Sequence, residues 1–113
     1  MIYTVTTYLA STISGNDIVL TNSSNDFGTS LTVMTDAGAG SDATLVDSTS
    51  VSLGGSSVGG ALSVTGPGID VTGSVSAGSL TLDASGGTLT DTGGQLVVTG
   101  TSILAVTGAD VLA

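Results

Sequence analysis

The chain has 113 residues, a length suited to one domain, and nine Asp residues without any Lys or Arg give it a formal charge of -9. Because no basic residue is available to attract phosphate groups, the composition excludes a nucleic-acid partner. The absence of His and Cys also excludes imidazole chemistry, thiol chemistry and soft-metal sites. The longest apolar run, residues 103–106, is far shorter than the roughly 20 residues of a membrane-spanning helix, so no membrane insertion is expected.

Short apolar segments predict β-strands along the whole chain. Each segment has an apolar-x-apolar pattern, which in a strand places two apolar side chains on the same face. In chain order the expected strands contain residues 18–20, 31–33, 51–53, 62–64, 69–71, 80–82 and 96–98. Gly pairs between them, such as Gly59-Gly60 and Gly93-Gly94, are interpreted as turns that need positive φ. No segment has helical periodicity, so the predicted fold class is all-β.

A repeat of roughly 16–20 residues is visible in the C-terminal half. Leu62, Leu80 and Leu96 begin similar strings and follow one another at similar intervals. Each is followed by a second apolar point seven to nine positions later, so one unit holds two short strands. A unit of this size fits one coil of a β-solenoid, and residues 1–113 are expected to form a single domain of about six coils. A compact β-sandwich is the alternative, although the scarcity of aromatic residues favours a narrow solenoid interior.

The N-terminal half is less regular than the C-terminal half. The interval from Leu31 to Leu62 is too long for one coil of the expected size. Residues 35–43 are rich in Gly, Ala and Asp. We therefore expect them to form a loop that protrudes from the coil.

Two stretches carry a resemblance to a known family. Residues 20–33, LTNSSNDFGTSLTV, and residues 77–91, AGSLTLDASGGTLTD, resemble the β-strand repeats of filamentous-haemagglutinin-like bacterial surface adhesins and related exoproteins. The resemblance covers residues 16–113 and rests on composition and period, with no catalytic or binding residue to carry over. It implies a right-handed parallel β-helix that acts as a rigid stalk at the cell surface. The chain departs from the family in its complete lack of basic residues and in the long interval between Leu31 and Leu62.

Calcium is the only metal for which the chain offers suitable ligands, since oxygen atoms are all it can supply. Candidate ligands are Asp17, Asp26, Asp42 and Asp70. Asp42 and Asp70 end strings that match part of the calcium-binding nonapeptide of RTX β-rolls, and Asp17 and Asp26 are nine positions apart. That nonapeptide binds calcium in adjacent tandem copies, whereas the copies here are scattered. The alternative interpretation is that these side chains form local turns and that the chain binds no cofactor.

Catalysis is not expected. Asp83 and Asp91 could be postulated as a carboxylate pair of a glycan hydrolase, but no cation is present to hold an acidic sugar. Ser and Thr hydroxyls lack a His or Lys base to activate them.

These observations favour a structural role. We expect a segment of an extracellular or cell-surface adhesin, either a rigid stalk or a self-assembling filament subunit. Its expected partners are copies of itself stacked head to tail or flanking repeats and, for an adhesin, an unidentified host or matrix ligand. An RTX-like calcium-binding β-roll of a secreted protein is the alternative.

Overall fold

The computed structural model describes residues 6–10, 15, 17–27, 30–35 and 40–107. These residues form eleven β-strands and no helix. The strands are β1 (Thr6–Ala10), β2 (Ile18–Leu20), β3 (Ser30–Met34), β4 (Ala43–Val46), β5 (Val51–Leu53), β6 (Ser56–Gly66), β7 (Ile69–Val71), β8 (Ser74–Ser85), β9 (Leu89–Asp91), β10 (Gln95–Val98) and β11 (Ser102–Thr107). In the described part of the chain, no helix is long and apolar enough to cross a membrane.

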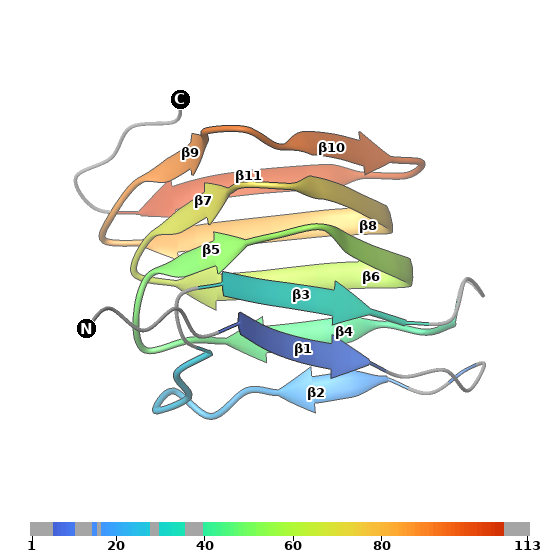
Figure 1. Cartoon of the computed structure of the whole chain (residues 1–113), viewed down its shortest axis with the longest axis horizontal. Coiled ribbons are helices and arrows are strands. Elements are labelled where there is room, and N and C mark those ends of the chain that lie inside the picture. The colour runs from blue at the N-terminus through green and yellow to red at the C-terminus, as the bar shows by residue number, and fades with distance from the viewer. Residues whose placement is uncertain (1–5, 11–14, 16, 28–29, 36–39, 108–113) are drawn as a thin grey trace.

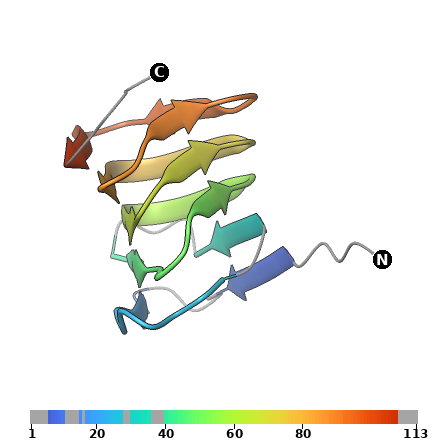
Figure 2. The same cartoon turned by 90° about the vertical axis from the view of Figure 1, so that its left-hand side faces the viewer.

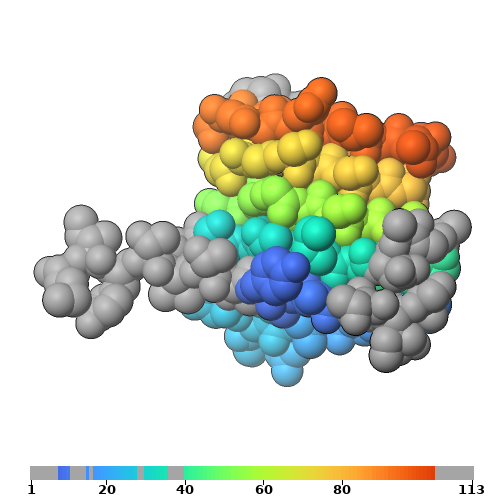
Figure 3. Space-filling view, turned by 45° about the vertical axis from the view of Figure 1, so that its right-hand side comes forward, coloured from blue at the N-terminus to red at the C-terminus, as the bar shows by residue number. Residues whose placement is uncertain are grey.

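The strands stack into a β-solenoid of about four turns, in which every strand pairing is parallel. One ladder contains β1, β3, β5, β7 and β9. A second joins the ends of β1 and β3, the beginnings of β6 and β8, and β10. A third joins β2, β4, the ends of β6 and β8, and β11. The path climbs in a right-handed sense (Figures 1 and 2), and the turns appear as successive bands on the surface (Figure 3). The predicted all-β solenoid is therefore confirmed.

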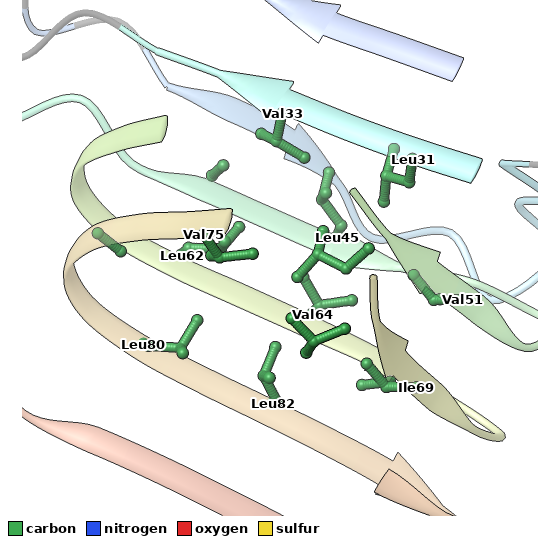
Figure 4. Packing of buried hydrophobic residues seen from close by; sticks show 14 of the residues in the cluster. Leu31, Val33, Leu45, Val51, Leu62, Val64, Ile69, Val75, Leu80 and Leu82 are labelled. Atoms are coloured by element: carbon green, nitrogen blue, oxygen red, sulfur yellow. The ribbon is translucent and has the colours of Figure 1, made fainter. Parts of the chain in front are cut away.

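Alternating side chains explain why these segments form stacked strands. Along β6, residues 56, 58, 60, 62, 64 and 66 are buried while the residues between them are exposed or half-buried. Leu45, Val64 and Leu82 lie next to one another in register, and at most 1% of the surface of each residue is exposed. Figure 4 shows such inward side chains filling the space between the ladders. Burying each Leu contributes about 1.5–3 kcal/mol, so continuous inner rows are the main apolar stabilisation.

The coils are fewer than the sequence predicted, and the outermost coils are longer than the internal ones. Leu62 pairs with Leu80 as expected, but Leu80 pairs next with Ser102, which lies further along the chain than the expected Leu96. Leu96 pairs instead with Val75 on the second ladder, so its predicted equivalence to Leu62 and Leu80 is wrong. The reason is that a coil has three sides rather than two, and a Leu-x-apolar triplet can occupy any of them. The longer outermost coils contribute to the count of about four turns in place of six.

Glycine marks the corners, mostly for a different reason from the one predicted. Among the described glycines only Gly15 and Gly86 have positive φ. At Gly78 the constraint is close approach, because a Cβ atom there would lie 2.9 Å from the carbonyl oxygen of Gly59 in the turn below. Gly100 donates a 2.7 Å backbone hydrogen bond to Gly78 in the same column. Stacked corners therefore bring backbones so close that a side chain would separate them.

The irregular N-terminal interval has a simple explanation. Leu31 pairs with Leu53 on the first ladder, whereas Leu62 pairs with Ala43 on the third. Leu31 and Leu62 are thus not equivalent positions, and the interval between them is not one coil. The centre of the expected loop 35–43, residues 36–39, lies outside the described residues. At its base the hydroxyl of Thr35 donates to the carbonyl of Ser41 at 3.1 Å, which holds these two residues together.

Candidate functional site

Two of the candidate calcium ligands, Asp17 and Asp42, lie in one column of the third ladder. Asp17 precedes β2 and Asp42 precedes β4, and the backbone N–H of Asp42 donates to Oδ1 of Asp17 at 3.0 Å. Oδ1 of Asp42 in turn accepts the backbone N–H of Ala61 at 2.8 Å. Each carboxylate therefore accepts a hydrogen bond from the backbone of the next turn, at the point where that turn enters the third ladder. This arrangement holds successive turns in register.

Asp26 lies away from this column, at the other end of β2, and belongs to a different cluster. Oδ1 of Asp26 is 3.2 Å from the hydroxyl of Thr49, which also lies 3.0 Å from Oδ1 of Asp47. Asp17 and Asp26, although nine positions apart in the sequence, therefore do not form one site. It places Asp26 beside Asp47, a residue that the sequence reasoning missed.

Asp47 is the most buried Asp in this cluster, with only 4% of its surface exposed. Its Oδ1 accepts the backbone N–H of Thr49 at 2.9 Å, and its Oδ2 accepts that of Phe27 at 3.2 Å. These bonds compensate for the burial of a carboxylate that has no cationic partner. The sequence signal was present, since an Asp-x-Thr string such as Asp47-Ser48-Thr49 is typical of an Asx turn.

Asp70 lies in β7 on the first ladder, and its hydrogen-bond partners differ from those of Asp17, Asp26 and Asp42. The hydroxyl of Thr90 donates to its Oδ1 at 3.0 Å and that of Thr92 donates to its Oδ2 at 2.8 Å. Asp70 also lines a shallow hollow of about 110 Å³ with Ser50, Ser52, Thr88 and Thr90 among its walls. These two hydrogen bonds hold the Asp70 carboxylate to the next turn, and Asp70 and Thr90 form a cross-strand pair.

The postulated carboxylate pair of Asp83 and Asp91 is not assembled on one ladder. Asp83 belongs to β8 and pairs with Thr65 and Ala105 on the third ladder, whereas Asp91 belongs to β9 and pairs with Val71 on the first. Figure 1 shows these ladders on different sides of the solenoid. Oδ1 of Asp91 accepts the backbone N–H of Gly94 at 2.7 Å and closes a turn. Oδ1 of Asp83 is buried without a hydrogen bond.

Apart from Asp83, the geometry of these carboxylates is that of structural acceptors. Within the described ranges, no group of three acidic side chains converges in a way that could hold a metal ion. Calcium takes six to eight oxygen ligands, whereas the close carboxylates here come in pairs whose oxygens already accept hydrogen bonds. What the arrangement does chemically is to satisfy backbone N–H groups and hydroxyls between turns.

The middle of one outward column of the third ladder is a row of hydroxyl groups. Thr44, Ser63 and Thr81 lie next to one another in register and are half-buried, with Thr65 in the neighbouring outward column. Adjacent strands in a sheet are about 4.8 Å apart, so the hydroxyls recur at that interval along the axis. This surface carries no cationic group, because the chain has none.

A comparison with protein families finds a match. A family model described as repeats of unknown function (DUF5649) matches residues 4–34 and 40–84. No curated protein matches the chain. No solved structure matches it either.

Proposed function

The chain belongs to this family of repeats, and from its architecture we propose that it is a rigid structural segment of an extracellular bacterial surface protein. In this role the chain provides reach and display, as a stalk of the filamentous-haemagglutinin-like type does. The observation that carries the proposal is the continuity of the inner rows and backbone ladders through successive turns. A ladder of parallel strands resists bending because each turn is hydrogen-bonded to both of its neighbours.

The electrostatic character of the chain supports an exposed structural role. A formal charge of -9 keeps copies of a β-rich surface apart in solution and opposes non-specific aggregation. The lack of Lys and Arg removes every site for proteases that cleave after basic residues. Neither property requires a catalytic group or a cofactor, and we propose that the segment has none.

A calcium-binding β-roll remains the second candidate because Asp17 and Asp42 are adjacent. The hydrogen bonds that both carboxylates accept from the next turn favour the structural role instead. The two candidates differ in a measurable way, since a β-roll of this kind needs calcium to fold.

Rigidity can be tested with spin labels, because the chain has no Cys of its own. Ala10→Cys and Thr99→Cys place labels at exposed positions near the two ends of the stack. Double electron–electron resonance should give one narrow distance distribution that broadens only in denaturant. A broad distribution in native buffer would contradict a rigid stalk.

Localisation needs a separate test in the bacterium that encodes the chain. Antibodies raised against the folded chain should label intact cells as strongly as permeabilised cells. Labelling that appears only after permeabilisation would contradict a surface role.

A further inference from the structure

The large apolar side chains that are exposed lie only on the outermost turns of the described solenoid. They are Tyr8 and Val19, exposed by 63% and 62%, and Val97 and Ile103, exposed by 44% and 54%. Tyr8 and Val19 belong to β1 and β2, whereas Val97 and Ile103 belong to β10 and β11. The two ends of the stack therefore differ from its middle in the same way.

One outward column of the third ladder shows this difference most clearly. Its members in order are Val19, Thr44, Ser63, Thr81 and Ile103. The three internal members carry hydroxyls, which suit a solvated face. The first and last members are apolar and more than half exposed. An apolar residue at both ends of a polar column is expected if each end lies beside another apolar residue.

An inward column on the other side of the solenoid ends in the same way. Leu9 and Leu96 occupy its two ends, and Val33, Ser56 and Val75, which are all buried, lie between them. Leu9 and Leu96 are only partly buried although they pack against the core. Among the described residues, β1 pairs only with β3 and β10 only with β8, whereas the internal members of the column have a paired neighbour on both sides.

We propose that copies of this chain stack head to tail, with β10 and β11 of one copy pairing in parallel with β1 and β2 of the next. The continuing register places Ile103 beside Val19 of the next copy and Leu96 beside Leu9 of the next copy. A shift by one residue would turn every inward side chain outward, so the register is strongly specified. The proposal rests on the structural role proposed above and specifies its partner as a second copy of the chain.

The size of the contact is sufficient for a specific interface. The structure extends 36 Å and 26 Å in the two directions across the stack, as oriented in Figure 1. An ellipse with these axes covers roughly 700 Å², close to the roughly 800 Å² per partner of a standard interface. Head-to-tail contacts use two different surfaces and do not close, so the product is a filament. Because both copies are acidic, salt should strengthen the association by screening their repulsion.

The first test compares charge insertions on one column. Sedimentation velocity over a concentration series, in about 20 mM and about 500 mM NaCl, should show concentration-dependent growth that is stronger at high salt. Val19→Asp and Ile103→Asp should each weaken association at least about tenfold. The matched control Ser63→Asp adds the same charge to the middle of the same column and should change it less than about threefold. Circular dichroism checks that all variants fold.

The second test identifies the register. Oxidation of the double variant Val19→Cys with Ile103→Cys should give a ladder of covalent oligomers, whereas Thr44→Cys with Ile103→Cys should not. A monomer at every concentration and salt level would overturn the proposal, as would equal association of the Val19→Asp and Ser63→Asp variants. A monomer that still gives a narrow spin-label distance would leave the rigid stalk standing, so the two proposals can fail separately.

Discussion

Replacing Asp42 by Ala removes the carboxylate oxygen that accepts the backbone N–H of Ala61 at 2.8 Å. Asp42 and Ala61 are both half-buried, so water can compensate only in part for the lost acceptor. A hydrogen bond to a charged group contributes about 1.5–3 kcal/mol, and partial exposure reduces this to about 1–2 kcal/mol. For a domain of this size we expect Tm to fall by roughly 4–8 °C.

Asp42→Asn is the control that separates a structural acceptor from a calcium ligand. An amide oxygen can accept the same hydrogen bond without the negative charge, so this variant should lose less than about 1 kcal/mol. Urea unfolding of the three proteins, with EDTA and with about 5 mM calcium, measures both effects. Calcium should change neither the strand signal nor the stability of any of them. If wild-type protein folds only with calcium and Asp42→Asn is as unstable as Asp42→Ala, the reasoning is wrong.

Two further predictions concern the corners and the core. Gly78→Ala should destabilise the fold by about 1–3 kcal/mol because the new Cβ would lie 2.9 Å from a backbone oxygen, whereas Gly93→Ala, with its nearest atom at 3.7 Å, should be neutral or slightly stabilising. Leu80→Ala should cost about 2–5 kcal/mol because Leu80 is 1% exposed, whereas Val97→Ala on the surface should cost less than about 0.5 kcal/mol in the monomer. Chemical denaturation measures both pairs, and equal effects within either pair would contradict the assigned environments.

The strands could be predicted from the sequence because their cause is local. All seven apolar-x-apolar triplets lie in strands, since alternation alone decides which side chains face inward. The pairing of Leu62 with Leu80 was also predicted correctly. The position of Leu96 was not, because alternation does not show which side of a three-sided coil a triplet occupies.

The candidate site was harder to predict because its contacts join distant residues. Asp17 and Asp42 are far apart in the sequence, and only the register of β2 with β4 brings them together. Asp47 was overlooked although its Asx-turn string is visible in the sequence. A local string predicts a turn, but the contact between Asp47 and Phe27 depends on how the turns stack.

The bend in β6 bears on how a repeat of this kind can change in length. Val58 pairs with Ala77 on one side of the bend, and Ala61 pairs with Ser79 on the other. The corner of β6 therefore contains one residue more than the corner of β8. The corner therefore absorbs the extra residue while both flanking faces keep their inward and outward alternation. Insertions and deletions at corners can accumulate without disturbing the core. Related chains can then lose any fixed period in their sequences while their folds stay superimposable, turn by turn.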